Sequence, residues 1–273
     1  MIKDITLGQF FPGNTVLHRL DPRIKIILTV AYIVAIFLAK NMWSFFAVTA
    51  SAILLVFISK ISWKTILKSM KPLIFVLAFT TFFNLFWTTG DVLLISFWKI
   101  NIYLEGVIFS VMMILRISAL LIGTTVLLTY TTSPIMLTDA LERLLSPLRV
   151  IKLPVHEFSM MMTIALRFIP TLVEETDKIM CAQKARGADF ESGSLMRRAK
   201  ALVPILIPLF ISAFRRADEL ATAMECRCYR GGDGRTRMTQ LKLAGRDFAA
   251  VAVMAIFIVG LVSINLIPSA ITL

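Results

Sequence analysis

Five apolar runs, each close to the length needed to cross a bilayer, constrain this chain more than any other feature. They lie at residues 24–39, 43–59, 73–89, 107–130 and 248–273. A transmembrane helix needs about 20 predominantly apolar residues. Only 17% of the residues are charged, against about 25% in soluble domains, so no single soluble core accounts for this much apolar surface. We expect an all-α integral membrane protein with about five transmembrane helices, embedded in the lipid bilayer.

Connecting segments that are rich in Lys and Arg alternate along the chain with segments that are poor in them. Four Lys or Arg lie at or before the start of the first run, one follows it, four follow the second run, and segment 131–246 holds 18. By the positive-inside rule, this pattern predicts a cell-membrane protein with a cytoplasmic N-terminus and an outside C-terminus. Residues 1–21 lack the apolar centre of a signal peptide. The net charge of +12 follows these loops, so nucleic-acid binding is not expected.

Segment 131–246 is too long for a connector and too apolar for a solvated loop. Its apolar residues recur at helical spacing over 133–145, 154–186 and 195–227. We therefore expect three parts, with membrane helices at 1–130 and 247–273 and a cytoplasmic domain of long amphipathic helices at 131–246. The apolar stretch 202–214 is short for a span. A buried or interfacial helix is favoured there, although a crossing would invert the last span.

The two longest amphipathic stretches resemble each other at an offset of 41 residues. The matched pairs are Asp177 with Asp218, Ile179 with Leu220, Ala182 with Ala223, and Arg186 with Arg227. Each arginine comes at the end of a predicted helix, where its charge complements the helix dipole. The alternative is a charge-assisted contact to a partner, for which the planar guanidinium is suited. Two equivalent arginines would suit a partner with two equivalent sites.

Residues typical of catalysis or cofactor binding are sparse. The glycines at 231–234 lack the lysine of a phosphate-binding loop. His18 and His156 lie in separate segments, and three cysteines form no disulfide framework or zinc pattern. We therefore expect no cofactor, no metal site and no enzymatic activity. A membrane-embedded enzyme would require a cluster of His, Asp or Glu at one membrane face, and the carboxylates of segment 131–246 lack a matching His or metal-ligand pattern.

Arg116 is the one charge well inside an apolar run. Such a charge is a functional candidate, although a contact to a neighbouring helix or to carbonyls would give it a role in assembly. A stand-alone solute carrier is the alternative function for the whole chain. It predicts polar groups around a cavity, but Asn84, Arg116 and Asn265 are the few available in the runs.

Four short segments resemble one family of membrane proteins. Residues 8–13 (GQFFPG) and 17–25 (LHRLDPRIK) are similar to the amino-terminal signature of the transmembrane T component of energy-coupling factor transporters. Residues 182–187 (AQKARG) resemble the first Ala-Arg-Gly motif of that family, and 223–231 (AMECRCYRG) resemble the second. The four segments occur in the family's order over essentially the whole chain.

The resemblance implies a non-catalytic coupling subunit for vitamin or micronutrient uptake. Its partners would be two cytoplasmic ATPase subunits and a membrane-embedded, substrate-binding S component. The implied ATPase anchors are Ala185, Arg186 and Gly187 in the first motif, and Cys226, Arg227 and Cys228 in the second. Because Cys228 replaces the family's glycine, we expect the second helix to end differently. Methionines near these helices could adapt to varied partners, or simply fill a core.

Overall fold

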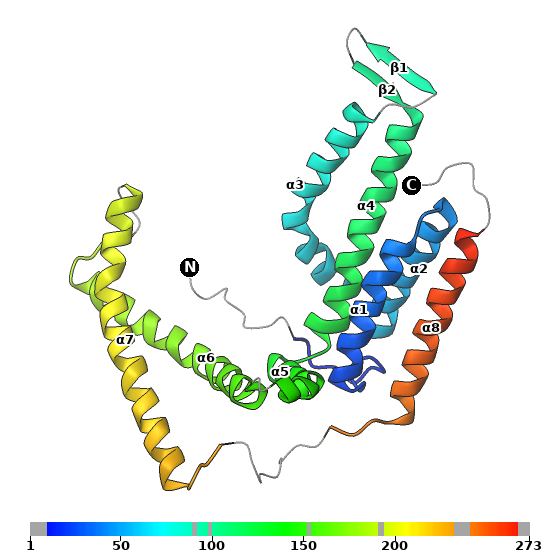
Figure 1. Ribbon diagram of the computed structural model, residues 1–273. Coiled ribbons are helices and arrows are strands. Elements are labelled where there is room, and N and C mark those ends of the chain that lie inside the picture. The colour runs from blue at the N-terminus through cyan, green and yellow to red at the C-terminus, as the bar shows by residue number, and fades with distance from the viewer. Residues whose placement is uncertain are drawn as a thin grey trace. The chain divides into compact units, whose positions relative to one another are not determined.

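The computed structural model describes residues 10–88, 92–97, 100–151, 154–190, 194–231 and 241–266. The chain divides into two compact units, coloured along the chain in Figure 1. The membrane unit comprises Gly8–Leu137 and Leu241–Leu273, and the helical-hairpin unit includes Thr138–Gln240. The units change over at Thr138 and Leu241, whereas the sequence predicts boundaries after residues 130 and 246.

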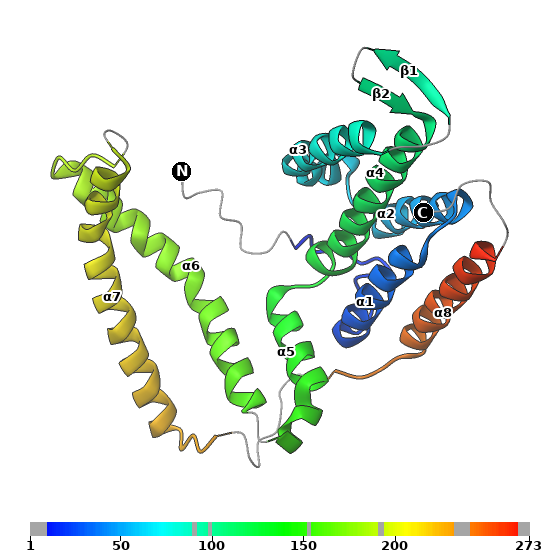
Figure 2. The same ribbon diagram turned by 45° about the horizontal axis from the view of Figure 1, so that its top comes forward.

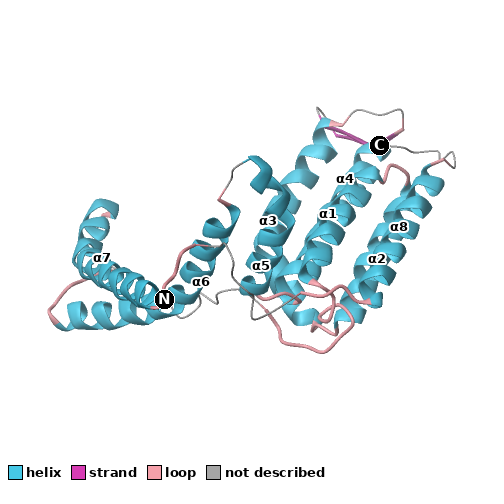
Figure 3. Ribbon diagram, turned by 60° about the horizontal axis from the view of Figure 1, so that its bottom comes forward, coloured by secondary structure: helices cyan, strands magenta, loops and turns pink. Residues whose placement is uncertain are grey.

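Five long helices form most of the described part of the membrane unit. They are α1 (Pro22–Leu38), α2 (Met42–Ser59), α3 (Trp63–Trp87), α4 (Leu104–Thr124) and α8 (Gly245–Asn265). Helix α4 contacts α1, α2 and α3, while α8 packs against α1 and α2, and Figure 3 shows them side by side. All except α1 are long and apolar enough to cross a bilayer. The chain is thus an all-α, multi-pass membrane protein, as predicted.

Helix α1 is the shortest of the five, with 17 residues, or about 26 Å. Its place among the spans stays a prediction. The other spans lie close to the expected runs, with two differences. Helix α3 begins at Trp63 rather than at residue 73, and α8 ends at Asn265, whereas the expected run continues to residue 273 and its part 267–273 lies outside the described residues. Helix α3 continues through Pro72, although a proline lacks the N–H of a regular helical hydrogen bond. Lys64, Lys68 and Lys71 therefore lie on a helix, whereas the sequence predicts a connection there.

The core of the membrane unit lies where α1, α2, α4 and α8 meet. Tyr32, Ile36, Phe45 and Val48 are at most 1% exposed. The turn Thr125–Tyr130, which extends α4, is a π-helix, and its Tyr130 is fully buried. These large side chains fill the space between helices, while the outward faces remain apolar, as a lipid-facing bundle requires.

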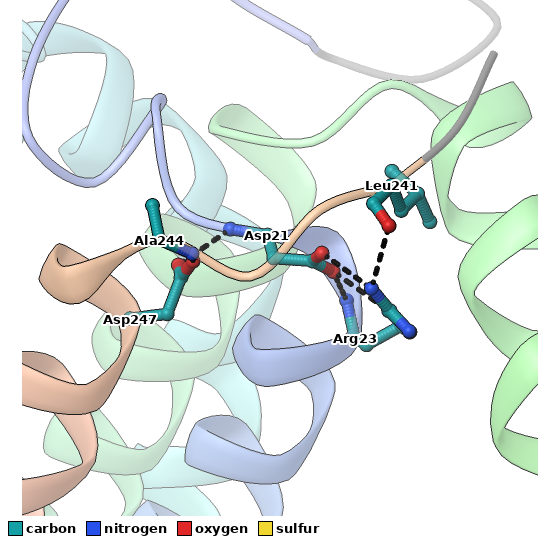
Figure 4. Close-up of polar contacts among 5 residues, drawn as sticks. All are labelled: Asp21, Arg23, Leu241, Ala244 and Asp247. Atoms are coloured by element: carbon teal, nitrogen blue, oxygen red, sulfur yellow. Dashed lines mark hydrogen bonds and ion pairs between the residues drawn. The ribbon is translucent and has the colours of Figure 1, made fainter.

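The start of α1 is held by residues that are distant in sequence (Figure 4). Asp21 caps α1 by accepting a hydrogen bond from the backbone N–H of Arg23, at 2.9 Å. The Arg23 guanidinium bonds to the Asp21 carboxylate at 2.9 Å and to the Leu241 carbonyl at 3.1 Å. Asp247 of α8 accepts from the backbone N–H groups of Asp21 and Ala244. This network joins the first helix to the last.

Lys25 makes a second long-range connection from the same helix start. Its side chain is only 2% exposed, and its ammonium group donates to the Thr131 carbonyl at 2.7 Å. The N–H of Phe11 donates to the Tyr130 carbonyl nearby, at 3.1 Å. The described part of the 8–25 signature is therefore structural, because it joins the N-terminal segment to the end of α4. Gly8 and Gln9 lie outside the described residues.

A short antiparallel hairpin between α3 and α4 was not predicted. Its strands are β1 (Leu93–Phe97) and β2 (Ile100–Tyr103), with Phe97 opposite Ile100 and a register shift between Leu93 and Ile95. Both strands are rich in branched apolar residues, which favour extended backbone. The sequence predicts only a connection between residues 89 and 107, because strands of five and four residues are too short for an alternating pattern to indicate a hairpin.

The helical-hairpin unit contains most of α5 (Pro134–Leu145), a 3-10 helix (Ser146–Ile151), α6 (Val155–Ala185) and α7 (Leu195–Cys226). The Ser133 hydroxyl caps α5 by accepting from the N–H of Met136. Stretch 202–214 is the interior of α7, and α7 is not among the helices suited to crossing a membrane. Figures 1 and 2 both show α6 and α7 running in opposite directions.

Candidate partner-binding site at two helix ends

Helix α6 ends at Ala185, and Arg186 is its C-cap. Gly187 follows with φ of +86°, in the left-handed region that glycine adopts without steric cost. The N–H of Gly187 donates to the Lys184 carbonyl, and the N–H of Ala188 donates to the Gln183 carbonyl, both at 3.0 Å. This pair of bonds is the Schellman motif. The motif leaves Arg186 at the last position of the helix, directly before the left-handed Gly187 changes the direction of the backbone.

Helix α7 ends in the same way. Arg227 is the C-cap, and Cys228 follows with φ of +54°. The N–H of Cys228 donates to the Glu225 carbonyl at 2.8 Å, and that of Tyr229 donates to the Met224 carbonyl at 3.0 Å. The prediction that the missing glycine would change this helix end is therefore wrong. The two hydrogen bonds outweigh the cost of a side chain in the left-handed region, about 1–2 kcal/mol.

The two helix ends are related by the offset of 41 found in the sequence. Glu175 of α6 and Arg216 of α7 also differ by 41, and they form an ion pair with an N–O distance of 2.8 Å. Farther along, the Tyr229 hydroxyl bonds to the Met160 sulfur at 3.1 Å, so the end of α7 lies at the start of α6. The two helices are therefore antiparallel. Glu175 and Arg216, which occupy equivalent positions in the two helices, meet at a point that is called the crossing below.

Because the helices are antiparallel, Arg186 and Arg227 lie on opposite sides of the crossing. Arg186 comes eleven residues after Glu175, and Arg227 comes eleven residues after Arg216. At 1.5 Å per residue, each arginine is about 16 Å from the crossing, and the two are up to about 33 Å apart. The hairpin therefore presents two similar cationic ends in a pseudo-twofold arrangement.

Both arginines are available for a partner. Arg186 and Arg227 are exposed, as are Ala185, Cys226 and Cys228 beside them. Neither guanidinium has a hydrogen bond or an ion pair within the described part of the chain. A guanidinium offers five N–H donors in a fixed plane, so each end can bind carboxylates or backbone carbonyls. The structure thus brings each triplet together at a helix end and keeps the two triplets apart.

The other candidate residues have structural contacts. Arg116 donates to the Ala39 carbonyl at 3.0 Å and lies 5.1 Å from the centre of the Phe45 ring, which supports the assembly role. His156 pairs with Glu142 at 2.9 Å, whereas His18 bonds to Thr15 in the membrane unit. Among the described residues, no group of three His, Cys, Asp or Glu could hold a metal ion. Residues 232–234 lie outside the described part.

Sequence reasoning assigned no role to Glu175, Arg216 or Tyr229. The offset of 41 was the signal that could have paired Glu175 with Arg216, but only antiparallel packing brings equivalent positions together. For the methionines, the sequence allowed either adaptable contacts or a core. Met161 and Met162 are exposed, whereas Met160, Met180 and Met224 are partly buried, so none of the five lies in a fully buried core.

The left-handed Cys228 predicts a stabilising substitution. Cys228→Gly should raise the free energy of unfolding by about 0.5–1 kcal/mol, because the relief of the left-handed backbone exceeds the entropy cost of glycine. Slower amide hydrogen exchange at Tyr229 would report the firmer helix end. The matched control is Cys226→Gly, which lies in helical backbone and should destabilise by about 1 kcal/mol. Equal effects of the two changes would contradict a cost at Cys228.

The Glu175–Arg216 pair predicts charge-dependent coupling at the crossing. Both side chains are partly exposed, by 23% and 34%, so the pair should contribute about 0.5–1 kcal/mol. Glu175→Arg should therefore lower the melting temperature, since it places two cations together, and adding Arg216→Glu should restore it. Thermal unfolding of the two single variants and the double variant measures this coupling. Additive losses without rescue would show that the pair is not formed.

Comparisons with known proteins agree over nearly the whole chain. Residues 13–239 match the family model described as cobalt transport protein. The chain is 54% identical over 251 residues to the energy-coupling factor transporter transmembrane protein EcfT of Clostridium kluyveri, covering 92% of this chain and 93% of that one. It is 53% identical to EcfT of Ruminiclostridium cellulolyticum (94% and 96% covered) and 43% identical to EcfT of Bacillus subtilis (92% and 94% covered).

Proposed function

Because the chain belongs to the family of energy-coupling factor transporter transmembrane proteins, we propose that it couples two cytoplasmic ATPase subunits to a substrate-binding S component. It is a membrane subunit of a transporter for a vitamin or another micronutrient. It does not catalyse a reaction itself, and ATP hydrolysis belongs to the partner subunits. The observation that carries this proposal is the pair of matching arginine-capped helix ends.

Two equivalent cationic ends are suited to two similar partners. Each ATPase subunit binds one end, with Arg186 or Arg227 donating to its carboxylates or carbonyls. Because α6 and α7 contact each other from Glu175–Arg216 to Met160–Tyr229, closure of the ATPase pair would move the two ends together. Contacts that differ between the open and closed ATPase pair are what can shift the conformation of the coupled partner.

The exposed apolar face of the hairpin unit supports an S component as the second partner. Leu206, Phe210 and Phe214 follow one another at four-residue spacing on α7 and are 46%, 62% and 69% exposed. Large contiguous apolar patches mark interaction sites in proteins. An S component with a matching apolar helix would cover this face and receive the motion of α6 and α7.

The charge pattern supports the predicted orientation. With α1 counted as a span, segment 131–246 and the lysine-rich start of α3 lie on the side of the N-terminus, and the C-terminus lies outside. ATPase subunits would then meet Arg186 and Arg227 in the cytoplasm. A cysteine-labelling experiment with a membrane-impermeant reagent on intact cells checks this, since exposed Cys181, Cys226 and Cys228 should react only after the membrane is opened.

A stand-alone carrier is less well supported. Each of its three polar candidates bonds to a backbone carbonyl: Asn84 to Thr80, Arg116 to Ala39, and Asn265 to Leu38. Two of these carbonyls belong to the end of α1, where such bonds satisfy free backbone groups. Side chains engaged in this way are not arranged around a substrate path.

Affinity purification of the full chain from mild detergent, followed by mass spectrometry, tests the coupling role. We expect two ATPase subunits and a small hydrophobic S component to co-purify. Reconstituted together, they should accumulate substrate only with ATP. A chain that purifies alone and transports a solute in liposomes would instead establish the carrier.

A further inference from the structure

One exposed face of α3 changes from basic to aromatic along its length. Lys64, Lys68 and Lys71 are spaced by four and three residues, and Phe75, Phe79, Phe82 and Phe86 continue the same spacing. Residues three or four apart lie on one side of a helix, so all seven form a single stripe. All seven side chains are exposed, and α3 contains no Asp or Glu.

A shallow, open apolar groove lies beside this stripe. It has a volume of about 520 Å³ and is lined by residues of α3, among them Ile74, Ala78 and Phe82, with Ile114 of α4 on the other side. Phe82 belongs to both the stripe and the groove. Lys71 comes one turn before Ile74 and two turns before Ala78, so the groove opens close to the basic end.

We propose that this surface binds an anionic phospholipid, with its phosphate on Lys64, Lys68 and Lys71 and an acyl chain in the groove. The lysines supply charge complementarity, because several cations at the end of a membrane helix attract anionic headgroups. Helix α3 is about 37 Å long, which exceeds the roughly 30 Å hydrocarbon core. Its first turns therefore reach the headgroup region when the phenylalanines lie among the acyl chains.

The basic segment followed by an apolar segment along α3 matches the headgroup and acyl chains of a phospholipid. Lipid chains alone would require no lysines, and a soluble anion would require no groove. A phospholipid requires both, in the sequence that α3 presents. Long lysine side chains also reach toward the interface from positions slightly inside it, so Lys71 can share the headgroup. This inference concerns the membrane unit and goes beyond the coupling role.

The test uses the full chain in nanodiscs of phosphatidylcholine with a minor fraction of phosphatidylglycerol. Electron paramagnetic resonance of spin-labelled lipids measures how strongly each lipid associates with the protein. We expect phosphatidylglycerol to associate about fivefold more strongly than phosphatidylcholine, the factor for one well-placed lysine near the surface. Changing the three lysines together to Gln should remove that preference, and changing them to Arg should retain it.

Three further arms distinguish a phospholipid site on α3 from a general charge effect and from a site for a soluble anion. Ala78→Trp, which fills the groove and keeps the lysines, should reduce the preference at least twofold. Changing Arg167, Arg215 and Arg230 to Gln removes the same charge from the other unit and should leave the preference intact. Soluble glycerol phosphate should not displace the lipid. Equal association of both lipids, or displacement by glycerol phosphate, would overturn the proposal and leave the α3 stripe to a protein partner or a free anion.

Discussion

Reversing the charge at both helix ends, by Arg186→Glu together with Arg227→Glu, is expected to reduce co-purification of the ATPase subunits about a hundredfold. Each hydrogen bond to a charged group contributes roughly 1.5–3 kcal/mol, so each single change should reduce recovery about tenfold. Quantitative mass spectrometry of affinity-purified complexes measures both effects. The two sites should contribute similarly, because both helices end in the same backbone geometry.

The matched control for this experiment lies on the same helices. Arg167 of α6 and Arg215 of α7 are exposed and lie nearer the crossing than the ends. Arg167→Glu with Arg215→Glu makes the same change in net charge and should leave ATPase recovery close to that of the unchanged chain. Arg186→Lys should recover only part of the binding, since lysine keeps the charge but lacks the planar fork. Full assembly and transport by the Arg186→Glu, Arg227→Glu chain would refute the anchoring role.

Gly123→Ala should be the most destabilising small substitution in the membrane unit, by about 2 kcal/mol. A Cβ at Gly123 would lie 2.0 Å from Cε1 of Tyr32 and within 3.0 Å of two other ring atoms. The ring cannot easily move, because its hydroxyl contacts Ser51 at 3.2 Å and it stacks on Phe257. Overpacking of this kind costs about 1–3 kcal/mol. The apparent Tm in detergent should fall by about 5 °C.

Two comparisons make this prediction specific. Gly260 is also inside a transmembrane helix, but a Cβ there would meet no atom within 4 Å, so Gly260→Ala should be neutral or slightly stabilising. In a Tyr32→Ala background, Gly123→Ala should no longer destabilise, because its steric partner has been removed. If Gly123→Ala costs the same with and without the ring, the close approach of α1 and α4 is not the cause.

The sequence alone was sufficient for features that depend on local chemistry. A bilayer requires long apolar runs wherever it is crossed, so the class of fold and most spans could be predicted. Helix ends are also local: Ser133 and Pro134 marked the start of α5, and Arg186 and Gly187 marked the end of α6. The offset of 41 between α6 and α7 was visible because it repeats residue types along the chain.

Other features could be seen only in the tertiary structure. The start of α3 was missed because the apolar run begins only at residue 73, whereas the helix begins at Trp63 and includes three lysines and Pro72 before that run. The matching end of α7 was missed because residue type suggested a cost at Cys228 but could not show which hydrogen bonds would offset it. The role of Gly123 was invisible, since nothing in its neighbourhood along the chain indicates Tyr32.

The physical reason is the range of the interactions. Hydropathy, capping and helix length depend on residues within a few positions of one another, so the amino-acid sequence by itself determined an all-α membrane bundle with two long amphipathic helices ending in arginine. Contacts such as Glu175 with Arg216, or Lys25 with Thr131, depend on how each helix is rotated and which neighbour it meets. Only the tertiary structure decided these contacts. It thereby also decided that Arg186 and Arg227 lie at opposite ends of the antiparallel pair of helices.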